Sequence, residues 1–279
     1  MILVAAVAVG VSVGIAGSNS SSNTGAMISA TEVPTQGSTQ TPTATIAKRP
    51  TPLPTAIPTA VSPLESHIMT YAGPQLSTLT SFNVSSFGLT GTIPKEIGML
   101  TSLTSLDLSN NALTGSIPTE IGLLTKLSSF RLFGNQLEGP IPSEIGSLSE
   151  LTLLDLSINQ LTGTIPAQFG QLQSLRGLEL SVNKLTGSIP AQFGQLQFLR
   201  GLDLSYNKLT GSIPWQLGTL SNLFIIVIDN NDLTGSVEGI FCPEHASILS
   251  GFSFTLSADC RKVTCSCCTV CCPNATVCW

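Results

Sequence analysis

Apolar and polar residues follow one recurring pattern along residues 76–237, L-x-x-L-x-x-L-x-L-S-x-N-x-L-T-G-x-I-P-x-x-x-G-x-L. The leucine that follows each G-x-L falls every 24 residues, from Leu79 to Leu223, and the register never slips. Self-similarity at a fixed period of this length indicates that each period forms one structural unit and that neighbouring units stack. The pattern therefore predicts an array of similar coils.

The L-x-L-S part of each period predicts a short strand, because apolar and polar positions alternate there. In the second repeat, Leu106 and Leu108 are expected to point inward, whereas Ser105, Asp107 and Ser109 are expected to face solvent. A single coil cannot bury its leucines, but stacked coils form one continuous core. With L-x-x-L-x-L-x-x-N inside each period, the sequence predicts an α/β solenoid of the leucine-rich repeat type.

Three further columns repeat at the same step. They contain an asparagine (Asn111, Asn135, Asn159, Asn183, Asn207, Asn231), a glycine (Gly91, Gly115, Gly139, Gly163, Gly187, Gly211, Gly235) and a proline (Pro94, Pro118, Pro142, Pro166, Pro190, Pro214). An amide side chain can satisfy backbone groups where a strand bends into a loop. Glycine permits a tight turn there, and proline fixes φ. We therefore interpret all three columns as scaffold.

The L-T-G-x-I-P version of the repeat resembles the plant-type leucine-rich repeats of receptor-like kinase ectodomains and polygalacturonase-inhibiting proteins. The resemblance implies a right-handed superhelix with a parallel β-sheet on the concave face, a second strand on one flank and a helical turn that closes each coil. We expect this domain to span residues 67–241, with about seven 24-residue repeats and the start of a degenerate last coil. That coil continues beyond residue 241, with Phe252 and Phe254 at its strand positions. The overall layout also resembles leucine-rich repeat proteins of diatoms.

Two segments precede the repeats. Residues 1–17 are apolar and uncharged, which predicts a signal-anchor or a signal peptide that connects the chain to a membrane or the secretory route. Residues 18–66 are rich in Ser, Thr and Pro and cannot bury a core, so we expect a disordered or semi-rigid stalk. A signal-anchor would place the repeats at the cell surface, and a cleaved signal peptide would lead to their secretion. In both cases we expect the repeats outside the cell.

Residues 242–279 form a Cys-rich tail that contains all 8 cysteines of the chain. Because Cys242 and Cys260 bracket the last coil, we expect them to form a capping disulfide in an oxidising compartment. The remaining cysteines allow many connectivities. A soft-metal site in C-x-C-C-x-x-C-C is the alternative, although the export signals favour disulfides. Asn83 and Asn274 begin N-x-S/T sequons and are candidate glycosylation sites.

The charge pattern and the motifs exclude several functional classes. A net charge of -5 without a basic stripe argues against nucleic acid as a partner. His67 and His245 lie outside the repeats, and no nucleophile, metal-protease or phosphate-binding motif is present. The sequence therefore predicts no enzyme activity, no cofactor and no metal.

The solvent-facing positions of the predicted concave sheet are the candidate binding surface. Aromatic and arginine side chains on a rigid sheet are common interface anchors, and an acidic run favours a positively charged ligand. The candidate residues are Asp107, Arg131, Phe133, Asp155, Glu179, Asp203 and Tyr206, with Ile158 and Val182 beside them and Arg176 and Arg200 where the strands begin.

These residues predict a recognition module that binds a protein, peptide or glycan through the concave face. Two other functions remain open at this point. The protein could be a structural or adhesive wall component that its Cys-rich tail crosslinks to neighbours. By fold-level analogy with the plant proteins, it could also inhibit a wall-degrading hydrolase.

Overall fold

The computed structural model describes residues 64, 78–241, 255–258, 263–264 and 270–271. Residue contacts divide the chain into two units, Met1–Thr59 and Ala60–Trp279, and every described residue belongs to the second. The predicted N-terminal anchor or signal peptide (1–17) and most of the predicted stalk (18–66) lie outside the described residues. Within the described part of the chain, no helix is both long and apolar enough to cross a membrane.

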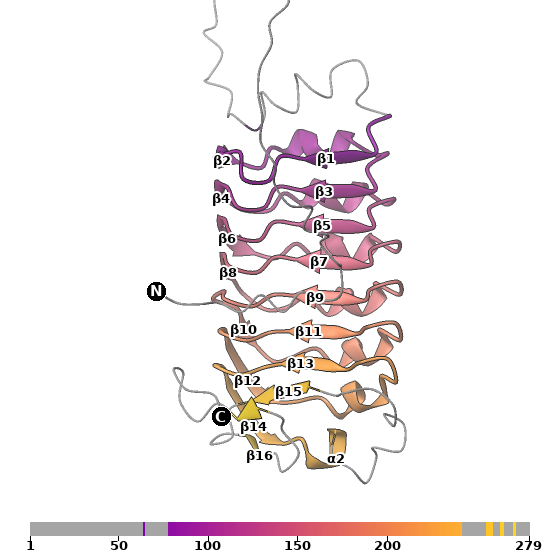
Figure 1. The fold of residues 1–279 in the computed structure, drawn as a ribbon, viewed down its shortest axis with the longest axis vertical. Coiled ribbons are helices and arrows are strands. Elements are labelled where there is room, and N and C mark those ends of the chain that lie inside the picture. The colour runs from indigo at the N-terminus through magenta and orange to yellow at the C-terminus, as the bar shows by residue number, and fades with distance from the viewer. Residues whose placement is uncertain (1–63, 65–77, 242–254, 259–262, 265–269, 272–279) are drawn as a thin grey trace, which may run out of the picture. The chain divides into compact units, whose positions relative to one another are not determined.

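The concave sheet contains nine parallel strands, one from each successive turn of the chain (Figure 1). Its strands are β1 (Ser81–Asn83), β3 (Ser105–Asp107), β5 (Ser129–Arg131), β7 (Leu153–Asp155), β9 (Gly177–Glu179), β11 (Gly201–Asp203), β13 (Ile225–Val227), β15 (Thr255–Ala258) and β17 (Val270–Cys271). From β1 to β13 the register steps by the 24-residue period, so that Leu106, Phe130 and Leu154 lie opposite one another. The predicted α/β solenoid is confirmed.

The L-T-G-x-I-P segments form a second row of parallel strands on one flank of the solenoid (Figure 1). One four-stranded sheet contains β2 (Thr90–Thr92), β4 (Ala112–Gly115), β6 (Gln136–Pro140) and β8 (Gln160–Thr162), and the other contains β10 (Thr186–Gly187), β12 (Lys208–Ser212), β14 (Asp232–Ser236) and β16 (Val263–Thr264). A bridge between Thr164 and Thr186 joins them. Gly115 in β4 has φ 72°, and a Cβ there would lie 2.9 Å from Cγ2 of Thr92, so this turn requires glycine.

Short 3-10 helices close the coils on the third side. They are η2 (Lys95–Met99), η3 (Thr119–Leu123), η4 (Ser143–Ser147), η5 (Ala167–Gln171), η6 (Ala191–Gln195) and η7 (Trp215–Thr219), and α2 (Glu238–Phe241) follows. A proline with extended backbone precedes each 3-10 helix, as Pro94 precedes η2 with φ -75°. The amide of Ile97 donates to the Pro94 carbonyl over 3.1 Å, so proline fixes where each helix begins.

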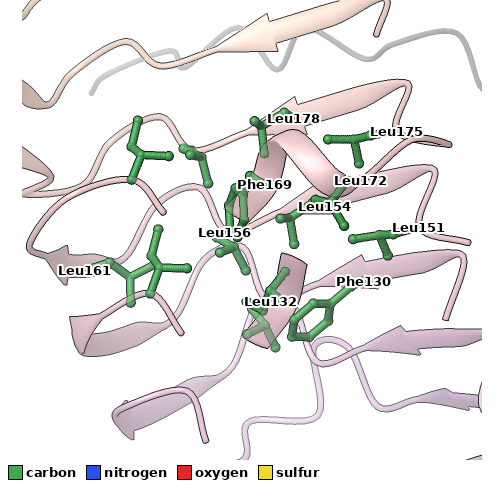
Figure 2. Close-up of a cluster of buried hydrophobic side chains, with 14 of the residues drawn as sticks. Phe130, Leu132, Leu151, Leu154, Leu156, Leu161, Phe169, Leu172, Leu175 and Leu178 are labelled. Atoms are coloured by element: carbon green, nitrogen blue, oxygen red, sulfur yellow. The ribbon is translucent and has the colours of Figure 1, made fainter. Parts of the chain in front are cut away.

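One hydrophobic core runs through the stacked coils. Figure 2 shows Phe130, Leu154 and Leu178 from neighbouring concave strands packed with Leu172 and Phe169 of the closing segments. These side chains have no exposed surface. Because each buried leucine or phenylalanine contributes about 1.5–3 kcal/mol, the shared core is the main stabilising term of the solenoid.

The asparagine column satisfies the backbone at each bend. In one coil, Nδ2 of Asn159 donates to the carbonyls of Leu156 (3.2 Å) and of Leu132 in the preceding coil (3.0 Å). Its Oδ1 accepts the amide of Leu137 over 3.0 Å. The same bonds recur at Asn135, where Leu113 donates to Oδ1 over 3.1 Å. The interpretation of this column as scaffold is confirmed.

The expected exposure of Ser109 is wrong. Ser109 is only 1% exposed, although Ser105 and Asp107 are half-buried at the surface as expected for that strand face. The alternation stops because β3 ends at Asp107 and the chain turns at Asn110, which has φ 53°. The Ser109 amide donates to Oδ1 of Asp107 over 3.0 Å, so this carboxylate holds the turn.

The expected strand positions of the last coil are also wrong. In β15 it is Leu256 that lies opposite Ile226 of β13, so the last coil is longer than the 24-residue period. Phe252 and Phe254 lie outside the described residues. Part of the Cys-rich tail extends the sheet, because Val270 and Cys271 form β17 beside β15. Cys242 and Cys260, the predicted capping disulfide, lie outside the described residues, as does the sequon residue Asn274.

Candidate functional site

The predicted central residues form one continuous column across the concave sheet, which we call the acidic column (Asp107, Arg131, Asp155, Glu179, Asp203). The parallel register places each of them directly opposite the next, and neighbouring strands lie about 4.8 Å apart. All of them are half-buried. The sheet therefore brings together residues that lie far apart in the sequence.

Arg131 compensates one end of the acidic column. Its Nη1 lies 3.8 Å from Oδ2 of Asp107, and the register places Asp155 on its other side. Desolvation by burial raises the pKa of Asp155 overall, although the hydrogen bonds from Ser157 and the Arg131 guanidinium lower it. One guanidinium thus lies between two aspartates, so Asp155 is compensated only in part. We call Asp155, Glu179 and Asp203 together the uncompensated part of the column.

Hydrogen bonds hold the two aspartates of this part in place. Oδ1 of Asp155 accepts the amide (3.1 Å) and the hydroxyl (2.6 Å) of Ser157. Oδ1 of Asp203 accepts the same two groups of Ser205, over 2.9 Å and 2.6 Å. Burial nevertheless raises the pKa of Asp203 as well. The serine in each L-D-L-S segment thus orients a carboxylate at the surface.

Glu179 lies between these two aspartates in the parallel register. Desolvation, followed by repulsion from Asp203 and from Asp155, raises the pKa of Glu179 from 4.5 to about 9. Glu179 is therefore protonated at neutral pH. The column therefore presents a neutral carboxylic acid at Glu179, which can donate a hydrogen bond, between Asp155 and Asp203.

Beside the column lie Ile158, Val182 and Tyr206, which we call the apolar strip. Their φ angles are 54°, 54° and 52°, in the left-handed region. The equivalent positions in other coils carry Ser86, Asn110, Gly134 and Asn230, and the asparagines and the glycine adopt this conformation easily. A β-branched residue there is an outlier that costs about 1–3 kcal/mol.

The apolar strip is accessible to a partner. Ile158 is 39% exposed and Tyr206 is 48% exposed, whereas Val182 is half-buried. The sequence prediction included these side chains but missed their backbone conformation. Asn110 and Gly134 at the equivalent positions could have indicated it, because asparagine and glycine favour the left-handed conformation. The predicted Phe133 precedes Gly134 by one residue, so it lies outside the strip, and it is half-buried.

The other predicted surface residues lie around this centre. Arg176 and Arg200 precede β9 and β11 and are exposed. Asn83 is exposed in β1, and its Oδ1 accepts the amide of Ser85 over 3.0 Å. Among the described residues, no group of histidine, cysteine and carboxylate side chains has the arrangement of a metal site. The concave surface therefore presents charge, hydrogen-bonding groups and apolar contacts on a rigid support.

Stacked coils with a rigid concave surface define a binding scaffold, and the comparisons identify its family. Leucine-rich repeat family models match residues 102–124, 126–148 and 149–209. The crystal structure of Pollen Receptor Kinase 3 is 34% identical over 59% of this chain and 79% of that one, with a TM-score of 0.53. The chain belongs to the plant-type leucine-rich repeat proteins. No curated protein matches the chain.

Two other solved structures are similar. The GASSHO1/SCHENGEN3 receptor kinase ectodomain from Arabidopsis thaliana, in complex with CASPARIAN STRIP INTEGRITY FACTOR 2, is 39% identical, with a TM-score of 0.58. That similarity covers 64% of this chain and 21% of the ectodomain, so the chain spans about a fifth of that relative. A plant ice-binding protein is 35% identical over 65% of this chain and 55% of that one, with a TM-score of 0.52.

Proposed function

We propose that the protein is an extracellular recognition module that binds a peptide or protein segment on the concave side of β7, β9 and β11. The observation that carries this proposal is the apolar strip. Three consecutive coils hold apolar side chains in a strained backbone conformation next to the uncompensated part of the acidic column. Strain of this kind persists where the surrounding structure enforces it, and it often accompanies a binding site.

The chemistry of the surface specifies a ligand with basic and apolar groups. Asp155 and Asp203 would pair with a Lys or Arg side chain, and the protonated Glu179 would donate to a carbonyl or hydroxyl of the ligand. Ile158 and Tyr206 would contact an apolar side chain beside the basic one. Aromatic contacts and buried charge pairs are the interactions that dominate such interfaces.

The relatives support a peptide or protein ligand. The GASSHO1/SCHENGEN3 ectodomain was crystallised with CASPARIAN STRIP INTEGRITY FACTOR 2, and another similar structure is the plant peptide hormone receptor RGFR1 in complex with RGF2. The export signals in the sequence support display of the repeats at the cell surface or their secretion. We propose that residues 1–17 connect the repeats to the membrane or to the secretory route.

Selection from a random peptide display library on the full-length chain tests this proposal. Recovered peptides should combine Lys or Arg with neighbouring apolar residues, and their affinity should fall as salt concentration rises. The variant Ile158→Asn/Val182→Asn/Tyr206→Asn should lose most of this affinity without losing stability, because asparagine tolerates the left-handed conformation. Recovery of peptides without basic residues, or unchanged affinity of the variant, would refute the proposed site.

A second candidate function is binding to ice, and one feature of the flank sheets favours it. Two columns of short polar side chains project beside the glycines of the L-T-G-x-I-P strands, and all of them are exposed. The first contains Thr90, Thr114, Thr162, Thr186, Thr210 and Thr234, and the second contains Thr92, Ser116, Thr164, Ser188, Ser212 and Ser236. Glu138 and Pro140 interrupt the columns in β6.

Hydroxyls repeated at the spacing of the strands, about 4.8 Å, could order water in a regular array. The similarity to a plant ice-binding protein supports this candidate. Inhibition of ice recrystallisation by the wild-type chain, and its loss in Thr162→Lys/Thr186→Lys/Thr210→Lys, would establish it. The concave variant Ile158→Asn/Val182→Asn/Tyr206→Asn is the matched control and should inhibit as the wild type does. Ice growth unaffected by the wild-type chain would reject this candidate.

A further inference from the structure

An open groove with a volume of about 1410 Å³ runs along the solenoid between the flank strands and the 3-10 helices. We call it the flank groove (Pro140–Glu144, Gly163–Gln168, Ser188–Gln192, Gly211–Gln216, with Thr119). Its floor is apolar and repeats from coil to coil, because the buried Ile165, Ile189 and Ile213 are each followed by a proline. The groove therefore follows the stacking direction across several coils and is suited to an extended chain.

Hydrogen-bonding side chains line both walls of the flank groove at the same repeat. Thr164, Ser188 and Ser212 lie on the side of the flank strands, and Gln168, Gln192 and Gln216 lie on the side of the 3-10 helices. Equivalent residues in neighbouring coils are about 4.8 Å apart. An amide both donates and accepts, as a hydroxyl does. The walls thus match a polymer that carries donors and acceptors at regular intervals.

The indole of Trp215 borders one end of the flank groove. Ala167 and Ala191 occupy the equivalent position in the two preceding coils, so the tryptophan follows a run of small side chains. It is 67% exposed. Trp215 also lines a second hollow of about 360 Å³ with Gln195 and Thr219. An indole accessible from two hollows offers a flat apolar face to a ligand, with its N–H as a polar edge.

The charge of the flank groove selects among polymers. Among the described residues that line it, Glu144 is the only charged one, and it lies towards the N-terminal end. The equivalent position is Glu96 in η2 and Glu120 in η3, whereas it is Gln168, Gln192 and Gln216 in η5, η6 and η7. The replacement of glutamate by glutamine keeps the side-chain length and removes the charge. The Trp215 end is therefore complementary to an uncharged ligand.

We propose that the flank groove binds a linear neutral polysaccharide. The sugar chain lies along the stacking direction, one pyranose ring stacks on Trp215, and glutamine amides and Ser/Thr hydroxyls bond to successive sugar hydroxyls. Sugar rings present C–H groups on their faces and hydroxyls at their edges, which matches an apolar floor between polar walls. This site is separate from the concave site of the proposed peptide ligand, so one molecule can bind both.

A proline-rich peptide is the competing occupant of an aromatic-bordered groove. Such peptides bind between several aromatic side chains, whereas Trp215 is the single aromatic residue among the described groove residues. A proline-rich peptide also has few backbone N–H groups. It therefore cannot donate hydrogen bonds to the oxygens of the repeated glutamine amides. The polysaccharide is therefore the better match.

Native affinity electrophoresis of the full-length chain tests the proposal. The gels contain hydroxyethylcellulose, laminarin or galactomannan as neutral probes, and polygalacturonate as an anionic one. We expect retardation by at least one neutral probe and none by polygalacturonate. Trp215→Ala should weaken the retarding interaction at least about tenfold, and Trp215→Phe should weaken it less. Gln192→Glu should weaken it by placing a charge in the middle of the groove.

Phe198→Ala is the matched control, because Phe198 is an exposed aromatic (57%) that does not line the groove. It should bind as the wild type does. Retardation by no neutral polysaccharide would overturn the proposal, as would equal retardation of Trp215→Ala and wild type. Binding of an oligoproline peptide that depends on Trp215, without binding of any glycan, would assign the groove to the competing occupant.

Discussion

Glu179 of β9 lies directly opposite Asp203 of β11 in the parallel register, and their proximity helps to raise the pKa of Glu179 to about 9. Asp155 lies opposite Glu179 on the other side. Three carboxyl groups thus share one half-buried surface, and burial favours the neutral form of the middle one. The protonation of Glu179 therefore affects the stability of the fold. It also affects the charge of the concave surface that a ligand would contact.

We predict that the wild-type chain loses stability as pH rises from 4.5 towards 9 and that Glu179→Gln loses much less. The folded state retains the Glu179 proton up to about pH 9, whereas the unfolded chain releases it near 4.5. The folded state therefore binds more protons in this window, and the free energy of unfolding falls by at most about 1.4 kcal/mol per pH unit. Urea denaturation at pH 5, 7 and 8 measures the difference.

Glu150→Gln removes an exposed carboxyl from the same chain and controls for net charge. Its urea midpoints should change with pH as those of the wild type do. The prediction fails if Glu179→Gln shows the wild-type slope between pH 5 and 8. Such a result would mean that Glu179 ionises in the folded state without much cost.

Val182→Asn is predicted to stabilise the fold by about 1 kcal/mol. The left-handed backbone of Val182 (φ 54°) crowds a β-branched side chain and is tolerated by asparagine, as at Asn110. The Val182 amide donates to the Ser205 carbonyl over 3.0 Å, and the substitution preserves that bond. Thermal and urea unfolding at pH 7 measure the gain.

Val227→Asn is the matched control for that prediction. Val227 is the last residue of β13 and pairs with Asp203 of β11, within extended backbone, where asparagine has a low propensity. This variant should be destabilised, opposite in sign to Val182→Asn. If both substitutions destabilise equally, the apolar strip is not strained and its conformation provides no support for a binding site.

Asn159→Ala is predicted to cost about 1–3 kcal/mol of stability. The substitution removes the side-chain acceptor of the buried Leu137 amide. The carbonyls of Leu132 and Leu156 lose one donor each but keep bonds from Asn135 and Asn183 of the same column. A buried amide left unpaired costs about 1–3 kcal/mol. Asn222→Ala is the control, because the exposed Asn222 makes one bond of 2.8 Å to Gln197 and should matter by under about 0.5 kcal/mol. Comparable losses in the two variants would contradict a structural role specific to the column.

The sequence predicted the core and the column residues well because the 24-residue period fixes both. A leucine such as Leu154 occupies an equivalent environment in every coil, so one correct assignment determines the others. Ser109 was misjudged because the alternation of a strand ends where the strand ends. The sequence predicted Phe252 and Phe254 at the strand positions of the last coil, where the structure has Leu256. The prediction failed because this coil departs from the 24-residue period on which it was based.

The candidate sites were harder to predict, since they depend on differences between coils. The acidic column was predictable from its register, but the raised pKa of Glu179 depends on burial and on both neighbouring strands. The walls of the flank groove come from two sides of each coil, the flank strands and the 3-10 helices. Trp215 stands out from the groove lining because Ala167 and Ala191 occupy the equivalent positions of the two preceding coils. Periodicity therefore specifies the scaffold, whereas departures from it specify the surface.

The near-identical segments 167–190 and 191–214 allow a final prediction about the concave site. They differ only at Ser174/Phe198, Glu179/Asp203 and Val182/Tyr206, so their core leucines and phenylalanines are the same. Phe198 is 57% exposed and Tyr206 is 48% exposed, which means that the differences concern the surface. The second segment carries two exposed aromatics that the first lacks, and aromatics are common at interface centres.

Phe198→Ser/Asp203→Glu/Tyr206→Val, which converts the second segment into a copy of the first, should weaken binding of a library-selected peptide at least about tenfold. The fold should persist because the core is unchanged, although the loss of the Ser205 bonds to Asp203 will cost about 1 kcal/mol. Isothermal titration measures affinity, and circular dichroism checks the fold. The reverse variant, Ser174→Phe/Glu179→Asp/Val182→Tyr, should bind as well as the wild type or better. Equal affinity of wild type and the first variant would exclude β11 from the peptide site, and the ligand would then have to contact β7 and β9 alone.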